Sequence, residues 1–441
     1  MSTPAFQSFE SLQSSRRFAR GFVAFSVSFV LCGLAFGAAP ISVKVGPGYT
    51  DVSPHQLVRT SGNFLYVITP TGMAYRSNTT ATLVVSKGNV AGIPTAYAAQ
   101  DVAHSPGTAK TGITTTAGVS SSASAIDGGD VIHSVWIDNQ GNTKGVSGNV
   151  YYAQFSTKTG KWGPATLLDG ATGWTGYVVG DQGVNIALDK NGAPHVCWTA
   201  KVSGKLRIKY SNRTGATWSK PVLADETAVT AINAWHPTLA FAPNGDLLLA
   251  YVDGLGGYSH DGAIRTRLRH ASGTWAATIT IPIGNVYTGI DNGPSLMITP
   301  DGRQHIAFTG TVSDIQYWYN AGSGWVTDEP LTKGMPQISH DPSLGPDGTA
   351  NGIYIYGHGT PVPVRGIGPN LYRFHKPAGG VWGPWIEIVP DPHTPTANHV
   401  DCAVSTRWSQ FFFNSPTTVD FAYYSELTPN SHDFTVYTGT H

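Results

Sequence analysis

Short runs in which apolar and polar residues alternate fill most of the chain, and turn-forming residues separate one run from the next. An alternation with a period of two is typical of a β-strand that buries one face. Four segments place glycine after asparagine or aspartate between two apolar runs, as β-hairpin turns require: "LDKNGAPHVCW", "FAPNGDLLLAY", "ITPDGRQHIAF" and "LGPDGTANGIYIY". Helical periodicity is absent. The pattern predicts an all-β fold.

A unit of fifty-odd residues repeats along the chain. Five units close with a strand that a tryptophan opens, and the spacings are 56, 57, 50 and 57 residues: Trp162, Trp218, Trp275, Trp325 and Trp382. Four short antiparallel strands in each unit predict a β-propeller, in which neighbouring blades bury each other's faces. Weaker units begin at His55 and Asn398. We therefore favour seven blades, with six as the alternative if one terminal unit is only a closing strand.

The composition fits a folded domain. Charged residues make up 12% and hydrophobic residues 41% of 441 residues, so the chain has enough apolar surface to fold. The 27 basic and 27 acidic residues balance, which argues against nucleic acid or an anionic membrane as a partner. A segment at 96–124 rich in small residues reads as a long loop. No linker divides the chain, and we expect one monomeric propeller domain at 40–441.

The first residues have the pattern of an export signal. Arg16, Arg17 and Arg20 precede an uncharged run at 21–37, and small residues follow at a suitable cleavage site. We expect a signal peptide at 1–38 and a secreted or periplasmic protein. The alternative is an uncleaved anchor, which would be its contact with a membrane. Beyond this segment we expect Cys197 and Cys402 to be separate buried thiols.

One hairpin, "KLRIKYSNRTGATWSKPVLA" at 205–224, carries a family resemblance. Ser211, Gly215, Thr217 and Trp218 match the Asp-box, Ser-x-Asp-x-Gly-x-Thr-Trp, although Arg213 stands where aspartate is expected. The chain thus resembles the sialidase-like, or bacterial-neuraminidase-repeat, propeller superfamily. The resemblance implies a hairpin between the third and fourth strands of a blade, away from any catalytic face. It identifies a fold and no reaction, and we expect Trp218 and its counterparts to pack between blades.

The resemblance does not extend to the catalytic residues of sialidases. True sialidases combine three arginines, a tyrosine nucleophile with its glutamate, and an aspartic acid. Only four glutamates follow the export signal: Glu226, Glu329, Glu387 and Glu426. We place two of these in outermost strands and Glu426 at the end of one, far from the axis. True sialidase activity is therefore the less favoured reading.

Polar residues collect where the innermost strands begin, which is where propellers usually bind ligands. We call this set the rim. It comprises His55-Gln56, Ser121-Ser122, Asp181-Gln182, Trp235-His236, Asp291-Asn292, His340-Asp341, and Asn398-His399 with Asp401. Two nearby loops add Tyr258, His260, Arg265 and Arg267, and His358 with Arg365 in an irregular insert. The alternative for each is a structural role, since polar residues at strand starts also hold loops.

Three other histidines occupy equivalent places in second strands, in "IHSVW", "PHVCW" and "QHIAF": His133, His195 and His305. Their recurrence predicts a shared packing role.

Aromatic rings with arginine and asparagine donors suit sugars and uronate carboxylates. We therefore expect a propeller that binds a polysaccharide and, if it is an enzyme, cleaves it by β-elimination. This reaction needs a base near neutral pKa and a group that neutralises the carboxylate. The candidates for catalysis are His236, His340, Tyr258 and Arg365. The candidates for substrate binding are His55, Trp235, Asn292, Asp341, His399, Asp401 and Arg267.

Two alternatives remain open at this point. The first is a lectin-like or protein-binding propeller that uses the same rim without chemistry. The second concerns cofactors: rim histidines or aspartates from different blades would suit a structural zinc or calcium ion in the channel. The cofactor is otherwise unknown, and we assign no residue as a metal ligand.

Overall fold

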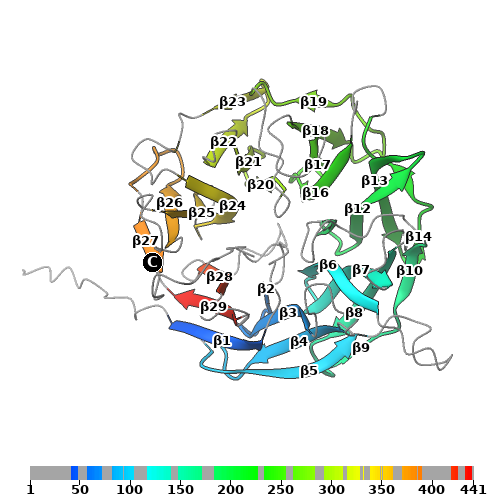
Figure 1. The fold of residues 1–441 in the computed structure, drawn as a ribbon, viewed down its shortest axis with the longest axis vertical. Coiled ribbons are helices and arrows are strands. Elements are labelled where there is room, and N and C mark those ends of the chain that lie inside the picture. The colour runs from blue at the N-terminus through cyan, green and yellow to red at the C-terminus, as the bar shows by residue number, and fades with distance from the viewer. Residues whose placement is uncertain are drawn as a thin grey trace, which may run out of the picture. The chain divides into compact units, whose positions relative to one another are not determined.

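A computed structural model shows an all-β propeller of four-stranded antiparallel blades (Figure 1). It describes residues 41–47, 57–71, 82–92, 94–103, 117–140, 148–170, 183–226, 233–254, 262–283, 293–310, 315–327, 331, 338–347, 349, 351–360, 370–384, 386–389, 419–425 and 433–439. The predicted signal peptide at 1–38 lies outside these residues. Among the residues described, no helix is long and apolar enough to cross a membrane.

The first three blades alternate strands and tight turns as the hydrophobic pattern predicts. Blade 1 contains β2 (Leu57–Arg59), β3 (Leu65–Thr71), β4 (Thr82–Gly88) and β5 (Tyr97–Ala103). Blade 2 contains β6 (Ala117–Ile126), β7 (Val131–Gln140), β8 (Asn149–Ser156), β9 (Lys161–Trp162) and β10 (Thr166–Asp169). Blade 3 contains β11 (Val184–Leu188), β12 (Pro194–Val202), β13 (Lys205–Thr214), β14 (Thr217–Trp218) and β15 (Val222–Leu223). The loop predicted at 96–124 was wrong in part, because β5 and β6 both begin within it.

Blades 2 and 3 each have one short strand beside their path of four, whereas the next three blades, like blade 1, have four strands only. Blade 4 contains β16 (Ala234–Phe241), β17 (Leu247–Asp253), β18 (Ala263–Arg269) and β19 (Ile279–Thr280). Blade 5 contains β20 (Ser295–Ile298), β21 (Gln304–Thr309), β22 (Ile315–Asn320) and β23 (Trp325–Thr327). Blade 6 contains β24 (Ile338–Pro346), β25 (Ile353–Thr360), β26 (Asn370–Lys376) and β27 (Ile386–Val389). The innermost strands β2, β6, β11, β16, β20 and β24 contact one another in this order.

A three-stranded sheet joins the two ends of the propeller and corrects the blade count. Its order is β1 (Ile41–Pro47), β29 (Asp433–Gly439) and β28 (Val419–Ser425). The favoured count of seven four-stranded blades was therefore wrong, and six is the number that the described residues form. The terminal unit read from Asn398 contributes closing strands, which pair with a strand from the other end of the domain.

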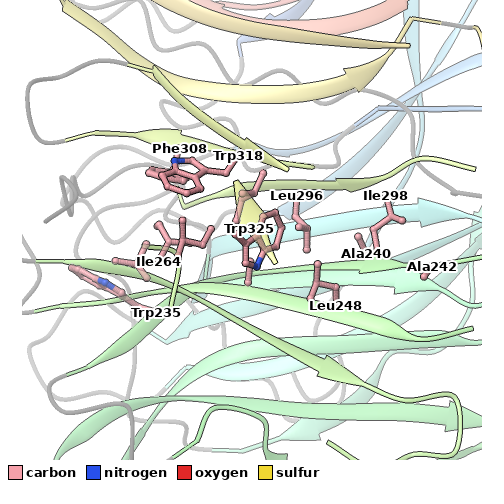
Figure 2. Packing of buried hydrophobic residues seen from close by; sticks show 14 residues of the cluster. Trp235, Ala240, Ala242, Leu248, Ile264, Leu296, Ile298, Phe308, Trp318 and Trp325 are labelled. Carbon is pink, nitrogen blue, oxygen red and sulfur yellow. The ribbon is translucent and has the colours of Figure 1, made fainter. Parts of the chain in front are cut away.

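The hydrophobic core is divided among the boundaries between neighbouring blades. One cluster combines Trp235, Leu248 and Ile264 of blade 4 with Leu296 and Trp318 of blade 5 (Figure 2). Corresponding clusters join blades 1 and 2, 2 and 3, 3 and 4, and 5 and 6. Blades 2 to 5 thus bury both faces, and strands β12, β16 and β17 of blades 3 and 4 are almost continuously buried.

The closing tryptophans pack between blades, as predicted. Trp218 of blade 3 meets Tyr152 of blade 2 edge-on, with ring centroids 4.8 Å apart. The same contact recurs between blades 3 and 4, with centroids 5.4 Å apart, and between blades 5 and 6, at 4.9 Å. The hairpin at 205–224 forms the turn between β13 and β14, and Gly215 there has a φ of 60°, which favours glycine. Arg213 extends from it to Tyr152, whose hydroxyl oxygen lies 3.4 Å from Nη1.

Candidate functional site

Three innermost strands are irregular near the end at which they begin. The pairing of β16 with β17 shifts between Trp235 and Thr238, and that of β24 with β25 shifts between His340 and Ser343. β6 has a shift of the same kind. A β-bulge redirects the side chains beside it, and bulges are over-represented next to active sites. All three irregularities therefore border rim pairs, and two of them, at the segments WHPT and HDPS, contain rim histidines or lie next to one.

The first bulge holds His236 in a costly backbone conformation. His236 has a φ of 50°, the left-handed region that non-glycine residues rarely adopt. Pro237 follows it, and a residue before proline normally favours extended backbone. Such conformations cost about 1–3 kcal/mol and cluster at functional sites. The imidazole is fully buried at 0% exposure, so a ligand could reach it only after the atoms above it move.

Trp235 lies in the core, which corrects its prediction as a substrate-binding residue. Its side chain is 0% exposed and belongs to the cluster between blades 4 and 5 (Figure 2). The register explains this placement, because Trp235 lies opposite Val252, which belongs to the same cluster. A sugar cannot stack on a ring that is enclosed in this way.

Arg267 also has a structural role, contrary to the prediction of substrate binding. Its Nε donates to the carbonyl oxygen of Ala276 at 2.8 Å, and its Nη1 donates to that of Ala224 at 2.8 Å. The guanidinium also lies 5.4 Å from the ring centroid of Trp275. Arg267 therefore links the outer strands of blades 3 and 4, and its donors are engaged with backbone.

Two ion pairs lie at the same end of blades 3 and 4, and one of them engages Arg265, which the sequence placed near the rim. Arg265 Nη2 lies 3.0 Å from Asp253 Oδ2, beside the start of β16. Arg207 pairs with the fully buried carboxylate of Asp225, and burial raises the pKa of this aspartate in spite of the arginine. The signal in the sequence was an arginine at the third position of a third strand. It did not predict the aspartate partners, because they lie 12 and 18 residues away.

The second bulge brings two predicted histidine positions together. His340 of β24 lies directly opposite His358 of β25 in the strand register. The sequence reading of His358 as part of an irregular insert was wrong, because β25 extends through it. Asp341 occupies the bulge that His236 occupies in blade 4, as the sequence alignment of the two rim pairs predicted. His340 and Asp341 thus lie near the start of β24, the innermost strand of blade 6.

Two polar side chains of innermost strands, one of them the rim residue Ser121, tie one blade to the next. Ser121 Oγ accepts a hydrogen bond from the backbone N–H of Gly183 at 3.0 Å, across blades 2 and 3. Asn185 Oδ1 accepts from the N–H of Leu239 at 3.2 Å, across blades 3 and 4. These bonds satisfy backbone donors of innermost strands, which have an unpaired edge. For Ser121 the structural alternative is therefore the correct one.

The second-strand histidines have the packing role predicted for them. In each, Nδ1 is hydrogen-bonded to a tyrosine hydroxyl of the adjacent third strand, at 2.5–2.7 Å: His133 with Tyr152, His195 with Tyr210, and His305 with Tyr317. Burial lowers the pKa of His195 to about 4 and that of His305 to about 3. Both are neutral at physiological pH.

The remaining candidates lie outside the described residues: His55, Tyr258, Asn292, Arg365, His399 and Asp401. Within the described part of the chain, no group of three or more histidine, cysteine or acidic side chains could hold a metal ion. Cys197 is a buried free thiol, and burial raises its pKa.

Comparison with known proteins identifies the fold. No protein-family model and no curated protein sequence matches the chain. Among solved structures, a PL25 ulvan lyase bound to a GlcA–Rha3S saccharide matches with a TM-score of 0.54 and 12% identity, over 92% of this chain and 96% of that one. An α-L-arabinofuranosidase, Arb93a from Fusarium graminearum, matches with a TM-score of 0.50 and 12% identity, over 78% of this chain and 98% of that one.

A sialidase is also similar, with a TM-score of 0.45 and 13% identity over 70% of this chain and 63% of the sialidase. The ulvan lyase and the arabinofuranosidase show that the chain shares their fold. At these identities the similarity concerns the fold, and the site has to be argued from this chain's own residues.

Proposed function

We propose that this protein binds a polysaccharide on the rim face and cleaves it by β-elimination. The observation that carries the proposal is the bulged start of β24, where His340 lies opposite His358. A β-bulge is a common way to aim a functional side chain. The ulvan lyase with a similar fold binds a saccharide that contains a glucuronic acid residue, and a uronate is the sugar that β-elimination requires.

His340, which precedes the bulge of β24, and His236, which lies in the bulge of β16, have different roles in this proposal. His340 is the candidate base, since imidazole has a pKa near neutrality and suits removal of a proton beside a carboxylate. The electron pair of that C–H bond forms the new C=C bond and breaks the glycosidic C–O bond at the β position, and the departing oxygen takes up a proton from water. His236 is fully buried and strained, so it shapes the start of β16 rather than touching the sugar. We propose that the protein acts as a monomer after export.

The direct test is an assay of the protein against uronate-containing and neutral polysaccharides, following the absorbance of the unsaturated product. The lyase proposal predicts product from the uronate polymer alone and its loss in His340→Ala. His236→Ala should weaken activity only as far as it disturbs folding. Binding without product would remove the lyase and leave the lectin-like alternative, and absence of glycan binding would remove both.

A further inference from the structure

The sheet of blade 6 has two faces of different character. Ile355 of β25 lies opposite Phe374 of β26, and both belong to the apolar cluster shared with blade 5. Side chains alternate between the faces of a sheet. Tyr354, Tyr356 and Arg373, which occupy the alternate positions in the register, therefore lie on the face turned away from blade 5.

Arg373 is a buried cation on this face. It is 7% exposed, and its Nε and Nη1 atoms are buried without a hydrogen-bond partner within the described part of the structure. Its guanidinium carbon lies 4.7 Å from the ring centroid of Tyr354. A cation–π contact of this kind compensates the charge only in part.

The two other arginines that are buried in the described part of the structure have charged or carbonyl partners, and Arg373 differs from them. Arg207, at 6% exposure, pairs with Asp225. Arg59, at 2%, donates from Nη1 to the carbonyl oxygens of Asn63 and Gly92. Burying a charged group without a counter-charge or hydrogen bonds costs several kcal/mol. The bare donors of Arg373 are therefore suited to an anion.

The position of Arg373 connects it to the rim. Arg373 lies opposite Tyr356, and two residues further along β25 His358 lies opposite His340. Residues two apart on a strand share a face and lie about 7 Å apart. A ligand that contacts the paired positions His340 and His358 can thus extend a charged group towards the neighbouring pair, Tyr356 and Arg373.

We propose that Arg373 binds the carboxylate of an acidic sugar and so selects uronate-containing chains. The planar guanidinium matches a carboxylate with paired hydrogen bonds, and the low exposure strengthens the interaction. This inference rests on the proposed polysaccharide function, and it assigns to Arg373 the carboxylate recognition that the sequence suggested for Arg365. Neutral sugars lack the group that the site needs.

The test compares binding of glucuronate-containing and neutral oligosaccharides of equal length by calorimetry, in the wild-type protein, Arg373→Lys and Arg373→Met. Charge-assisted hydrogen bonds support a loss of about 10-fold to 100-fold in affinity for the acidic oligosaccharide in Arg373→Met. Arg373→Lys should lose less, and the neutral oligosaccharide should bind weakly and equally to all three. Arg303→Met is the matched control, since Arg303 lies 5.5 Å from the Tyr319 ring centroid in blade 5.

Unchanged affinity for the acidic oligosaccharide in both variants would overturn the proposal. A loss of thermal stability with equal weakening for acidic and neutral oligosaccharides would also overturn it, because Arg373 would then be a structural anchor. If Arg373→Met does not fold, the Lys variant decides.

If the wild-type protein binds no oligosaccharide, the polysaccharide function fails, and free glucuronate then tests Arg373 separately. A rise in Tm with glucuronate in the wild type, absent in Arg373→Lys and not reproduced by glucose or sulfate, would retain the carboxylate site. No such rise would remove it.

Discussion

The boundaries between blades and the starts of the innermost strands use the same residue types in opposite ways. At the boundaries a histidine binds a tyrosine hydroxyl, and a tryptophan from the next blade packs on that tyrosine, as in His305, Tyr317 and Trp382. At the strand starts the residues differ from blade to blade, and bulges interrupt the register. Residues that recur in several blades with the same partners therefore have packing roles, whereas the positions that differ between blades form the candidate site.

We call this contact of histidine, tyrosine and tryptophan the packing unit. It varies at the boundary between blades 4 and 5. The indole Nε1 of Trp325 donates to Thr266 Oγ1 at 3.0 Å, in place of a ring contact with tyrosine. Trp325 is 7% exposed and remains in the core cluster (Figure 2). A tryptophan thus closes this boundary with a hydrogen bond and apolar packing.

We expect the largest loss of stability when the tyrosine of a packing unit is removed. Tyr317→Ala removes a ring that is 1% exposed and contacts both His305 and Trp382. Truncation of a buried aromatic residue should cost about 3–5 kcal/mol in the free energy of unfolding, measured by urea denaturation. Tyr319→Ala, at a half-buried position of the same strand, is the control and should cost less. Equal losses would mean that the unit has no special importance.

Acid should weaken the boundaries through the buried histidines. The pKa of His195 is about 4 in the folded protein, below the ordinary value of 6.5. As the pH falls below 6.5, the unfolded chain takes up the proton first, so stability is lost between pH 6.5 and about 4. The full loss from this one residue is about 3 kcal/mol. Urea midpoints at pH 7 and pH 5 should differ less in His195→Gln than in the wild type, and an identical difference would contradict the burial argument.

The smallest effect is expected at the boundary between blades 4 and 5. Trp325→Phe removes the hydrogen bond to Thr266 and should cost about 1 kcal/mol beyond the loss of ring volume. Trp218→Phe removes a similar volume where the partner is a tyrosine ring, so it should cost less. Chemical denaturation of both variants gives the comparison. A larger loss in Trp218→Phe would show that the ring contact outweighs the hydrogen bond.

Much of the fold could be predicted because its signals are local and repeated. The alternation of apolar residues, the Asn-Gly and Asp-Gly turns and the closing tryptophans each predicted a feature that the structure contains. The blade count could not be predicted in the same way, because β1 pairs with β29 and this pairing joins residues from opposite ends of the domain. Local periodicity does not record such a closure.

The site was predicted less well, since burial depends on which face of a sheet a residue occupies. Trp235 lies on the face towards blade 5, and a bulge one residue later determines this. Arg267 and Arg373 look alike in the sequence, as arginines in third strands, yet one binds backbone carbonyls and the other has bare donors. Only the three-dimensional partners separate them.

The most direct measurement pairs one histidine from each region: kcat for unsaturated product and the urea midpoint, in His340→Gln and His195→Gln. We expect His340→Gln to lower kcat about 10²-fold to 10⁴-fold at an unchanged midpoint. His195→Gln should lower the midpoint and leave the kcat of the folded protein unchanged. Wild-type activity in His340→Gln, or loss of kcat in fully folded His195→Gln, would contradict the division between packing and function.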